Sequence, residues 1–356
     1  MKLELFNYNL SKESIAKKPA SPRDSAKLFV YNRLNKKSIH SQFNKIGSFL
    51  QKGDVLVLND TRVIPARLIA RMIHTNGTRG RKFKILLLEK KATDVWTALI
   101  DGRGREAGVK LFFSKDLQGV IIKKLNDGIW EVRFNKKGKT LEDFIFRLGQ
   151  MPLPPYIKQE KYLQKNKDWY QTVYAKDAGS VAAPTAGLHF TRRLLKELKK
   201  KGVSIEYITL HVGMGTFMPV KTNNIKEHKM HDELATVTKL TANRLNKAKR
   251  EGRRIIAVGT TSARTLEAFA MPYGKQYSMK YGNKNVNIFI YPPYRFKFID
   301  AIITNFHLPK STLLMMMSAF ISEGDIKGIK TAKKLYQEAI KKKYTFYSYG
   351  DAMLIE

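Results

Sequence analysis

Histidine, the side chain best suited to move protons near neutral pH, is concentrated in one part of this 356-residue chain. Five of the seven histidines lie between residues 189 and 307, namely His189, His211, His228, His231 and His307. This concentration favours acid–base chemistry or ligand contact in that part of the chain. For any single histidine, a structural hydrogen bond is the alternative.

A metal site is the second chemistry to consider, in the sequence HKMHDE at 228–233. Residues three apart share one face of a helix, so His228 and His231 could point the same way with Glu233 nearby. The order lacks the HExxH pattern of helical zinc sites, and the chain contains no cysteine. Cysteine-ligated metals, thiolate nucleophiles and disulfides are therefore excluded. We expect no metal, and we expect acid–base chemistry or ribose contact from these histidines.

Polar side chains also follow four apolar runs that are typical of buried strands, at 55–60, 203–213, 254–262 and 301–307. Ligands of α/β sheets bind outside the carboxyl ends of the strands, so these side chains are expected to face one crevice. Capping of the next helix is the alternative for the threonines and serine, although a helix N-terminus also offers N–H groups to an anion. The side chains are Asn59, Asp60, Thr61, Arg62, His211, Thr260, Thr261, Ser262, Thr304, Asn305 and His307.

Short runs rich in β-branched and aromatic residues fill 66–134 and are separated by Gly, Asn and Asp turns. This spacing predicts about six antiparallel strands. Closure would remove the exposed edges of such strands, so we predict a small barrel-like or sandwich-like unit. A helical pattern at 140–149 leads out of it, and the prolines of 151–156 mark a border.

Outside this block, apolar runs alternate with helical patterns. The predicted fold class is α/β, a mixed α/β core domain with an inserted small β-barrel-like domain. The core domain is expected to be discontinuous, with residues 1–65 and 150–356, and the insert to comprise 66–149. The stretch 271–287 is polar and rich in turn residues, which predicts a surface loop. The helical patterns lie at 191–201, 241–250 and 311–320.

Charge is the strongest feature of the composition, since 66 Lys and Arg against 30 Asp and Glu give a net charge of +36. Such a charge attracts polyphosphates and predicts a nucleic-acid partner, although a lysine-rich genome composition is the alternative explanation. The N-terminus MKLELFNYNL lacks the apolar core of a signal peptide, and no run approaches the roughly 20 apolar residues of a membrane span. We expect a cytoplasmic monomer with no membrane partner.

Nine ordered motifs spread nearly from end to end resemble one family, the S-adenosylmethionine:tRNA ribosyltransferase-isomerases of queuosine biosynthesis. Their length and order make chance similarity remote. The motifs are LNDTRVIPARL at 58–68, MPLPPYI at 151–157, YQTVYA at 170–175, GSVAAPTAGLHFT at 179–191, LHVGMGTF at 210–217, HKMHDE at 228–233, AVGTTSARTLE at 257–267, ITNFHLPKSTLLM at 303–315 and YSYGDAML at 347–354.

The resemblance implies a reaction with two substrates, S-adenosylmethionine and tRNA. The ribosyl part of S-adenosylmethionine is transferred to 7-aminomethyl-7-deazaguanine at the wobble position and isomerised, giving epoxyqueuosine in tRNA, adenine and methionine. The donor's sulfonium acidifies the adjacent 5′ C–H, so a base can open the ribose, while adenine needs a proton donor to leave. The scheme requires no metal, nicotinamide or cysteine.

We assign hypothetical roles to side chains within these motifs from the chemistry required. Their alternative is a buried polar network that braces the sheet. The acid–base group comprises His189, His211, Glu233 and His307. Thr260, Thr261, Ser262, Arg264 and Asn305 are expected to hold the carboxylate or ribose of S-adenosylmethionine. Asn59, Asp60, Arg62, Arg67, Tyr349 and Asp351 are expected to contact the tRNA substrate, with Asp351 receiving its cationic amine.

Binding of an anticodon stem-loop would explain the basic charge, because phosphate contacts supply affinity and an unstacked base is needed for chemistry. Phe190, Phe306, Tyr347 and Tyr349 are stacking candidates. Arg79, Arg81, Lys82, Arg103 and Arg105 of the insert are candidates to hold the stem. Two other functions stay open, a noncatalytic RNA-binding protein and an S-adenosylmethionine-dependent RNA methyltransferase. The missing Rossmann glycine turn disfavours the methyltransferase.

Overall fold

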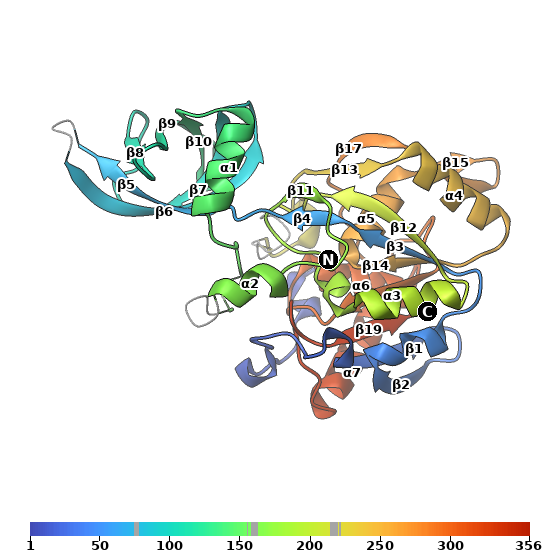
Figure 1. Cartoon of the computed structure of the whole chain (residues 1–356). Coiled ribbons are helices and arrows are strands. Elements are labelled where there is room, and N and C mark those ends of the chain that lie inside the picture. Colours follow the sequence, from blue (N-terminus) through green and yellow to red (C-terminus); the bar gives the residue numbers. More distant parts are fainter. Residues whose placement is uncertain (75–77, 155, 158–162, 214–219, 221) are drawn as a thin grey trace.

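A computed structural model describes residues 1–356 except 75–77, 155, 158–162, 214–219 and 221 (Figure 1). Within the described residues, the core holds one nine-stranded sheet in the order β17-β13-β12-β3-β14-β18-β19-β1-β2. β12, β3, β14 and β18 are parallel neighbours, and β19 is antiparallel to β18. The bounds are β1 Lys27–Asn32, β2 Lys37–Gln42, β3 Val55–Asn59, β12 Ser204–Leu210, β13 Glu233–Val237, β14 Ile255–Val258, β17 Gly282–Val286, β18 Ala301–Asn305 and β19 Ala352–Ile355.

Both faces of this sheet are buried, because alternate side chains of its central strands enter two different hydrophobic clusters. In β3, Val55 and Val57 pack on one side, with residues of α4, α5, α6 and α7. Leu56 and Leu58 pack on the other side, with α3. Continuous apolar runs are therefore what these strands require. The helices are α3 Arg192–Lys200, α4 Lys239–Arg250, α5 Thr260–Phe269, α6 Thr312–Ile321 and α7 Gly328–Lys341.

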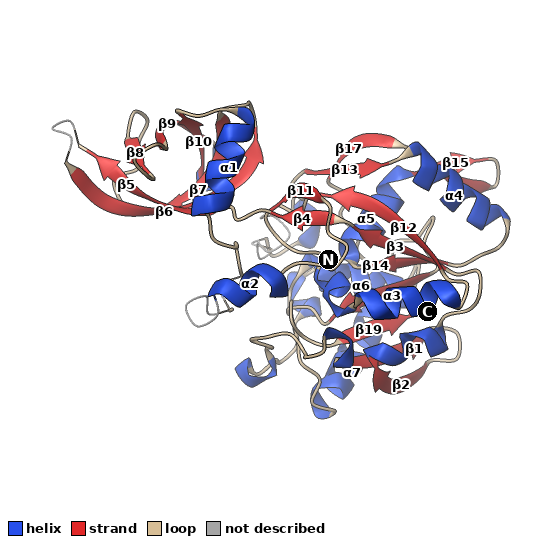
Figure 2. Cartoon of the chain, in the orientation of Figure 1, coloured by secondary structure: helices blue, strands red, loops and turns tan. Residues whose placement is uncertain are grey.

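The insert forms a closed antiparallel barrel in the order β10-β7-β6-β5-β8-β9, set at one end of the molecule (Figure 2). Helix α1, Gly138–Leu148, joins the barrel's core through Leu141 and Ile145. The predicted fold class, a mixed α/β core with a small β-barrel, is confirmed. The domain boundaries at 65/66 and 149/150 stay a prediction. The barrel strands are β5 Arg67–Ile73, β6 Arg79–Lys90, β7 Val95–Asp101, β8 Lys110–Phe112, β9 Gln118–Lys124 and β10 Ile129–Phe134.

The chain enters and leaves the barrel side by side. Arg67 and Gln150 exchange two backbone hydrogen bonds of 3.1 and 2.8 Å. A Cβ at Gly149 would lie 1.8 Å from the carbonyl oxygen of Pro65, so only glycine fits where the two connections pass.

The remaining elements are short. β4 and β11 form a parallel pair beside the core, and α2 follows the proline segment. No helix of the described part of the chain has the length and apolar character needed to span a membrane. The bounds are β4 Thr61–Val63, β11 Asp177–Ser180, α2 Leu163–Trp169, β15 Ala270–Tyr273, β16 Gln276–Met279, and the 3-10 helices η1 Leu3–Phe6, η2 Lys12–Ser14, η3 Arg23–Ser25, η4 Phe43–Phe49, η5 Asn126–Gly128, η6 Thr185–His189 and η8 Ile225–Glu227.

The prediction of a surface loop at 271–287 is wrong. β15 and β16 form a hairpin, and β17 pairs with β13 at the edge of the large sheet. The strand Gly282–Val286 has the sequence GNKNV, and only Val286 is buried. Backbone hydrogen bonds hold this edge strand, so it needs no apolar alternation that a sequence would display.

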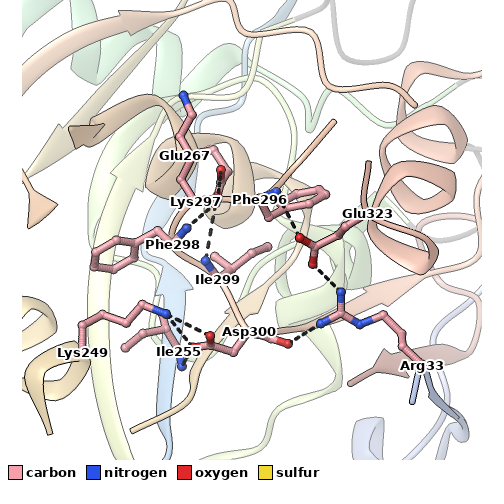
Figure 3. Close-up of polar contacts among 10 residues, drawn as sticks. All are labelled: Arg33, Lys249, Ile255, Glu267, Phe296, Lys297, Phe298, Ile299, Asp300 and Glu323. Atoms are coloured by element: carbon pink, nitrogen blue, oxygen red, sulfur yellow. Dashed lines mark hydrogen bonds and ion pairs between the residues drawn. The ribbon is translucent and has the colours of Figure 1, made fainter. Parts of the chain in front are cut away.

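A buried carboxylate fixes the segment that leads into β18 (Figure 3). Glu267 of α5 accepts backbone hydrogen bonds from Lys297 at 2.9 Å, Phe298 at 3.0 Å and Ile299 at 3.4 Å. The hydroxyl of Tyr294 donates a fourth bond at 3.0 Å. The side chain of Glu267 is almost fully buried, and burial raises its pKa.

Asp300 continues this network at the start of the parallel strands. Its carboxylate accepts bonds from the Lys249 ammonium at 2.9 and 3.0 Å and from the Ile255 N–H at 2.7 Å. Its carbonyl accepts a bond from Arg33, which also pairs with the partly exposed Glu323. These contacts set the amino ends of β14 and β18 together.

Glu267→Ala is expected to lower the free energy of unfolding, because it leaves buried N–H donors without an acceptor at about 1–3 kcal/mol for a donor left unpaired. The matched control is Glu323→Gln, which weakens a partly exposed ion pair and should cost at most about 1 kcal/mol. Urea unfolding of both variants measures the difference. Equal losses in the two variants would contradict a structural role for the Glu267 carboxylate.

Candidate active site

The parallel pairing of β12, β3, β14 and β18 places the polar residues that follow these strands along one edge of the sheet (Figure 1). His211 follows β12, Asn59 ends β3, Thr260 follows β14 and Asn305 ends β18. The structure thus brings together groups from four distant parts of the sequence. Their contacts divide this edge into a region around His211 and a region around His189.

His211 is oriented by neighbours from two other segments. Its Nδ1 lies 2.9 Å from the Thr61 hydroxyl. A Cβ at Gly179 would lie 2.8 Å from the imidazole Cε1, so the glycine lets the backbone pack against the ring. Burial lowers the pKa of His211, and the negative charge of Asp177 opposes that shift. The imidazole is therefore neutral at neutral pH and able to accept a proton.

A cavity of about 620 Å³ lies between the barrel and this edge of the sheet. Trp96 and Thr97 of β7 contribute from the barrel, and Gly179, His211 and Glu233 contribute from the core. A cavity of this size is typical of a small-molecule or nucleobase site. The barrel therefore supplies one wall of the space into which His211 faces.

Glu233 and Arg264 form an ion pair in which both side chains are buried. The Gly213 N–H donates to Glu233 Oε1 at 2.9 Å. Arg264 also donates to the carbonyls of Val286 at 3.2 Å and Ile288 at 3.3 Å. These partners make Arg264 a support for Glu233, and its predicted contact with S-adenosylmethionine stays a prediction.

His189 lies in the second region, beside the end of β18. The Asn305 amide nitrogen is 3.2 Å from His189 Nε2, and the Thr185 hydroxyl donates to Asn305 Oδ1 at 2.9 Å. Burial, followed by the positive charge of Arg23, lowers the pKa of His189 to about 4. At neutral pH this histidine is therefore neutral and held by hydrogen bonds inside the protein.

His307 is also buried. Its Nε2 lies 2.9 Å from the Thr304 hydroxyl, its N–H donates to the Tyr336 oxygen at 3.2 Å, and its carbonyl accepts a bond from the Tyr8 hydroxyl. Burial lowers the pKa of His307 to about 3. These contacts are those of a histidine that braces the end of β18, and its predicted acid–base role stays a prediction.

The N-terminus of α5 carries two buried hydroxyls, those of Thr261 and Ser262. Neither has a hydrogen-bond partner among the described residues. Thr260 precedes them and is also buried, and Gly259 takes a φ of 88°, a conformation that favours glycine. Buried polar groups are normally paired, so these two hydroxyls are exceptions, and their predicted contact with S-adenosylmethionine stays a prediction.

Two of the predicted substrate contacts lie at the end of β3. Asn59 is used inside the protein, since its side chain donates to and accepts from the backbone of Leu210 at 3.0 Å. Asp60 accepts a bond from the Thr209 hydroxyl at 2.7 Å, and burial raises its pKa. Arg62 is exposed on β4. Among Asn59, Asp60 and Arg62, Arg62 is the most accessible to a large substrate.

The other three predicted contacts lie apart from these. Arg67 donates to the Leu153 carbonyl at 3.2 Å, next to the barrel connection. Asp351 accepts bonds from the N–H groups of Lys27 and Thr345, each at 2.7 Å. Its two oxygens thus hold a turn, which leaves it poorly placed for a cationic amine. The hydroxyl of Tyr349 is buried and has no partner among the described residues.

The aromatic stacking candidates are mostly core residues. Phe190 and Phe306 are fully buried in the two clusters that flank the sheet, and Tyr349 is 4% exposed. Tyr347 is the one of the four that is partly exposed. The prediction that Phe190 or Phe306 stacks on an RNA base is therefore wrong, because packing inside the core covers both rings.

The histidine pair of HKMHDE does not share a helical face. His228 and His231 lie in irregular backbone between η8 and β13, and Glu233 begins β13. The described residues include no group of three or more His, Asp or Glu side chains arranged to hold a metal ion. The second half of the LHVGMGTF motif, from residue 214 on, lies outside the described residues.

Arg23 is a residue at this edge that the sequence did not single out. Its guanidinium donates to the carbonyls of Gln171 at 2.6 Å and of Asp168, and its charge acts on His189 and Tyr349. Burial lowers the pKa of Arg23. The surrounding sequence PRDSAK carries no motif signal, so only the fold could reveal its position.

Comparisons with known proteins find relatives along the whole chain. A family described as "Queuosine biosynthesis protein" matches residues 3–355. Curated relatives named S-adenosylmethionine:tRNA ribosyltransferase-isomerase include those of Desulfitobacterium hafniense, 48% identical, and Thermotoga maritima, 44% identical, each matched over the full length of both chains.

A solved structure is similar as well. The crystal structure of an S-adenosylmethionine tRNA ribosyltransferase from Thermotoga maritima superposes with a TM-score of 0.55 at 34% identity, over 99% of this chain and 100% of that one. Sequence and architecture thus agree along the whole length. The chain belongs to the queuosine biosynthesis protein family.

Proposed function

We propose that this protein transfers and isomerises the ribosyl part of S-adenosylmethionine onto 7-aminomethyl-7-deazaguanine at the wobble position of tRNA. Adenine and methionine leave, and epoxyqueuosine remains in the tRNA. The observation that carries this proposal is the full-length similarity to relatives named for this activity. S-adenosylmethionine serves as the ribosyl-donating co-substrate, and the scheme needs no metal.

The chemistry requires a base near the donor's 5′ carbon and a proton for the departing adenine. The sulfonium acidifies the 5′ C–H, and methionine departs as a neutral thioether. We assign the base to His211, because its imidazole is neutral, oriented by Thr61 and part of the cavity wall. Glu233 lines the same cavity and is held by Arg264, so it is the second member of the acid–base group.

The unpaired hydroxyls of Thr261 and Ser262 support a role in holding the donor. With Thr260 and the N–H groups of the α5 N-terminus, they would bind the methionyl carboxylate or ribose hydroxyls. His189 and Asn305 are assigned to positioning at the neighbouring strand end, since their hydrogen bonds join β18 to η6.

We propose that the barrel holds the anticodon stem-loop while the target base enters the site at the strand ends. Arg79, Arg81, Arg103 and Arg105 lie on exposed barrel segments, as phosphate contacts require. The target base must leave its stack to reach a buried site. We further propose that the protein acts as a monomer in the cytoplasm.

Two other functions are less well supported. A noncatalytic RNA-binding protein would need no oriented neutral histidine and no unpaired hydroxyls at the strand ends. An RNA methyltransferase would release S-adenosylhomocysteine in place of adenine and methionine. The full-length relatives are named ribosyltransferase-isomerases, not methyltransferases.

The first experiment is product analysis with the purified protein, S-adenosylmethionine and tRNA that carries 7-aminomethyl-7-deazaguanine. We expect adenine, methionine and epoxyqueuosine in equal amounts by mass spectrometry. Methylated RNA with S-adenosylhomocysteine would support the methyltransferase instead. Tight tRNA binding without adenine release would support the noncatalytic alternative.

The role of His211 predicts the pH dependence of the reaction. A base must be unprotonated, so kcat/KM should fall as the pH drops through the His211 pKa, which burial places below the ordinary 6.5. His211→Gln should lower kcat/KM by roughly 10²- to 10⁴-fold and remove that acidic limb. The control is His74→Gln on the exposed barrel hairpin. An acidic limb that survives in His211→Gln would assign the base elsewhere.

The role of the barrel predicts a salt effect. Replacing Arg103 and Arg105 together by glutamate should weaken tRNA binding and flatten the plot of log Kd against log salt by about 0.9 for each phosphate that the protein no longer neutralises. The control reverses Lys36 in the β1–β2 turn and Lys37 at the start of β2, both outside the barrel. An unchanged salt slope in the arginine variant would remove these residues from the RNA surface.

A further inference from the structure

Two tyrosines stack at the same edge of the sheet: Tyr347, a stacking candidate from the sequence, and Tyr156, which has no role so far. The ring centroids of Tyr156 and Tyr347 are 4.7 Å apart, with an angle of 29° between the ring planes. Both residues are partly exposed. The Tyr156 hydroxyl lies 2.6 Å from the Ser348 hydroxyl, which fixes the Tyr156 ring relative to the turn that carries Tyr347.

This pair lies directly on the end of β18. The Tyr347 N–H donates to the Phe306 carbonyl at 3.1 Å, one residue beyond the strand. The Asn305 amide, which contacts His189, also donates to the Gly350 carbonyl at 3.4 Å. The rings therefore adjoin the region around His189, outside the residues that line the 620 Å³ cavity.

Tyr347 is held in a conformation that tyrosine disfavours. Its φ is 74°, in the left-handed region, where a side chain crowds the backbone. The Gly350 N–H donates to the Tyr347 carbonyl at 2.9 Å, and the Phe346 N–H donates to the Ser14 carbonyl at 2.8 Å, so bonds on both sides impose the bend. Glycine would satisfy this backbone better, which points to a use for the ring itself.

The chemistry of a stacked, partly exposed aromatic pair is the binding of another flat ring. Burial raises the pKa of Tyr347 to about 12, so its ring stays uncharged at neutral pH. Stacking of a nucleobase on an aromatic side chain gives affinity with little dependence on base identity. A pair pre-stacked in this way loses little freedom when it binds a third ring.

We propose that Tyr156 and Tyr347 form a stacking platform for a purine-like ring of one of the two substrates at the end of β18. This inference rests on the proposed function, since both substrates carry such a ring: the adenine of S-adenosylmethionine and the target base of the RNA. The platform would hold its ring beside the His189 region while the chemistry proceeds near His211.

The test uses a variant that removes the ring without straining the turn. Tyr347→Gly accepts a φ of 74° and deletes the ring, whereas Tyr347→Phe keeps the ring and removes only the hydroxyl. Lys36→Gly, at a φ of 59° in the β1–β2 turn, controls for the relief of strain. Tyr273→Ala controls for removal of a tyrosine that is 74% exposed elsewhere.

The first arm measures the Kd of fluorescent anticodon stem-loops that carry either guanine or an abasic nucleotide at the wobble position. The second arm titrates S-adenosylmethionine by calorimetry into enzyme saturated with the guanine stem-loop, which lacks the amine needed for reaction. Base stacking corresponds to roughly a 5- to 100-fold change in Kd. We expect Tyr347→Gly to lose that factor in one arm, and Tyr347→Phe to keep it.

Loss of the preference for guanine over the abasic stem-loop would identify the ring as the RNA base, and weaker S-adenosylmethionine binding would identify it as adenine. Values within twofold of wild type in both arms, as expected for Lys36→Gly and Tyr273→Ala, would overturn the platform. If Tyr347→Gly melts well below wild type, Tyr156→Leu replaces it, because it removes the supporting ring. Neither arm requires turnover, so failure of the proposed reaction would show separately, as absent adenine release by wild type.

Discussion

The site depends on one constraint, the parallel pairing of β12, β3, β14 and β18 in adjacent positions. Parallel strands end on the same side, so residues separated by up to about 250 positions in the chain must meet there. Asn59 strengthens this arrangement, because its amide forms two bonds with the backbone of Leu210 and locks the ends of β3 and β12 together. Without that register, His211 would be separated from Thr61 and from its place in the cavity wall.

Electrostatics at this edge differ from those of the molecule as a whole. The chain carries a net charge of +36, yet burial keeps His189 and His307 neutral, and Arg264 is matched by Glu233. A buried ion pair recovers its desolvation cost only when further hydrogen bonds satisfy both partners, and here Gly213 and two carbonyls supply them. The net charge of the chain can therefore attract RNA phosphates, while His189, His307 and the Glu233–Arg264 pair add no net charge to the site.

The sequence was sufficient to predict the strands that have a clear apolar pattern and the polar residues that follow them. The runs at 55–60 and 301–307 became β3 and β18, and the short runs of 66–134 became the barrel. The sequence did not predict features that depend on backbone pairing or on which side chains become partners in the fold. β17 has no apolar alternation to display, and the motif around Arg264 does not reveal that Glu233, 31 residues away, takes its guanidinium. Asp351 and Asn59 have residue types that suit ligand contact, but turns and strand ends use their polar atoms first.

The position of the barrel depends on local contacts between the two connections to the core. The barrel is also the part that, in the proposed reaction, joins RNA binding to the catalytic cavity. The entering and leaving segments are paired through Arg67 and Gln150, and Gly149 allows them to pass closely. Because Trp96 and Thr97 share a cavity with His211 and Glu233, an RNA held on the outer barrel needs to move only its target nucleotide inward. The barrel and the core each supply one wall of this cavity. If the barrel binds the RNA as proposed, recognition of the stem would be coupled to assembly of the site.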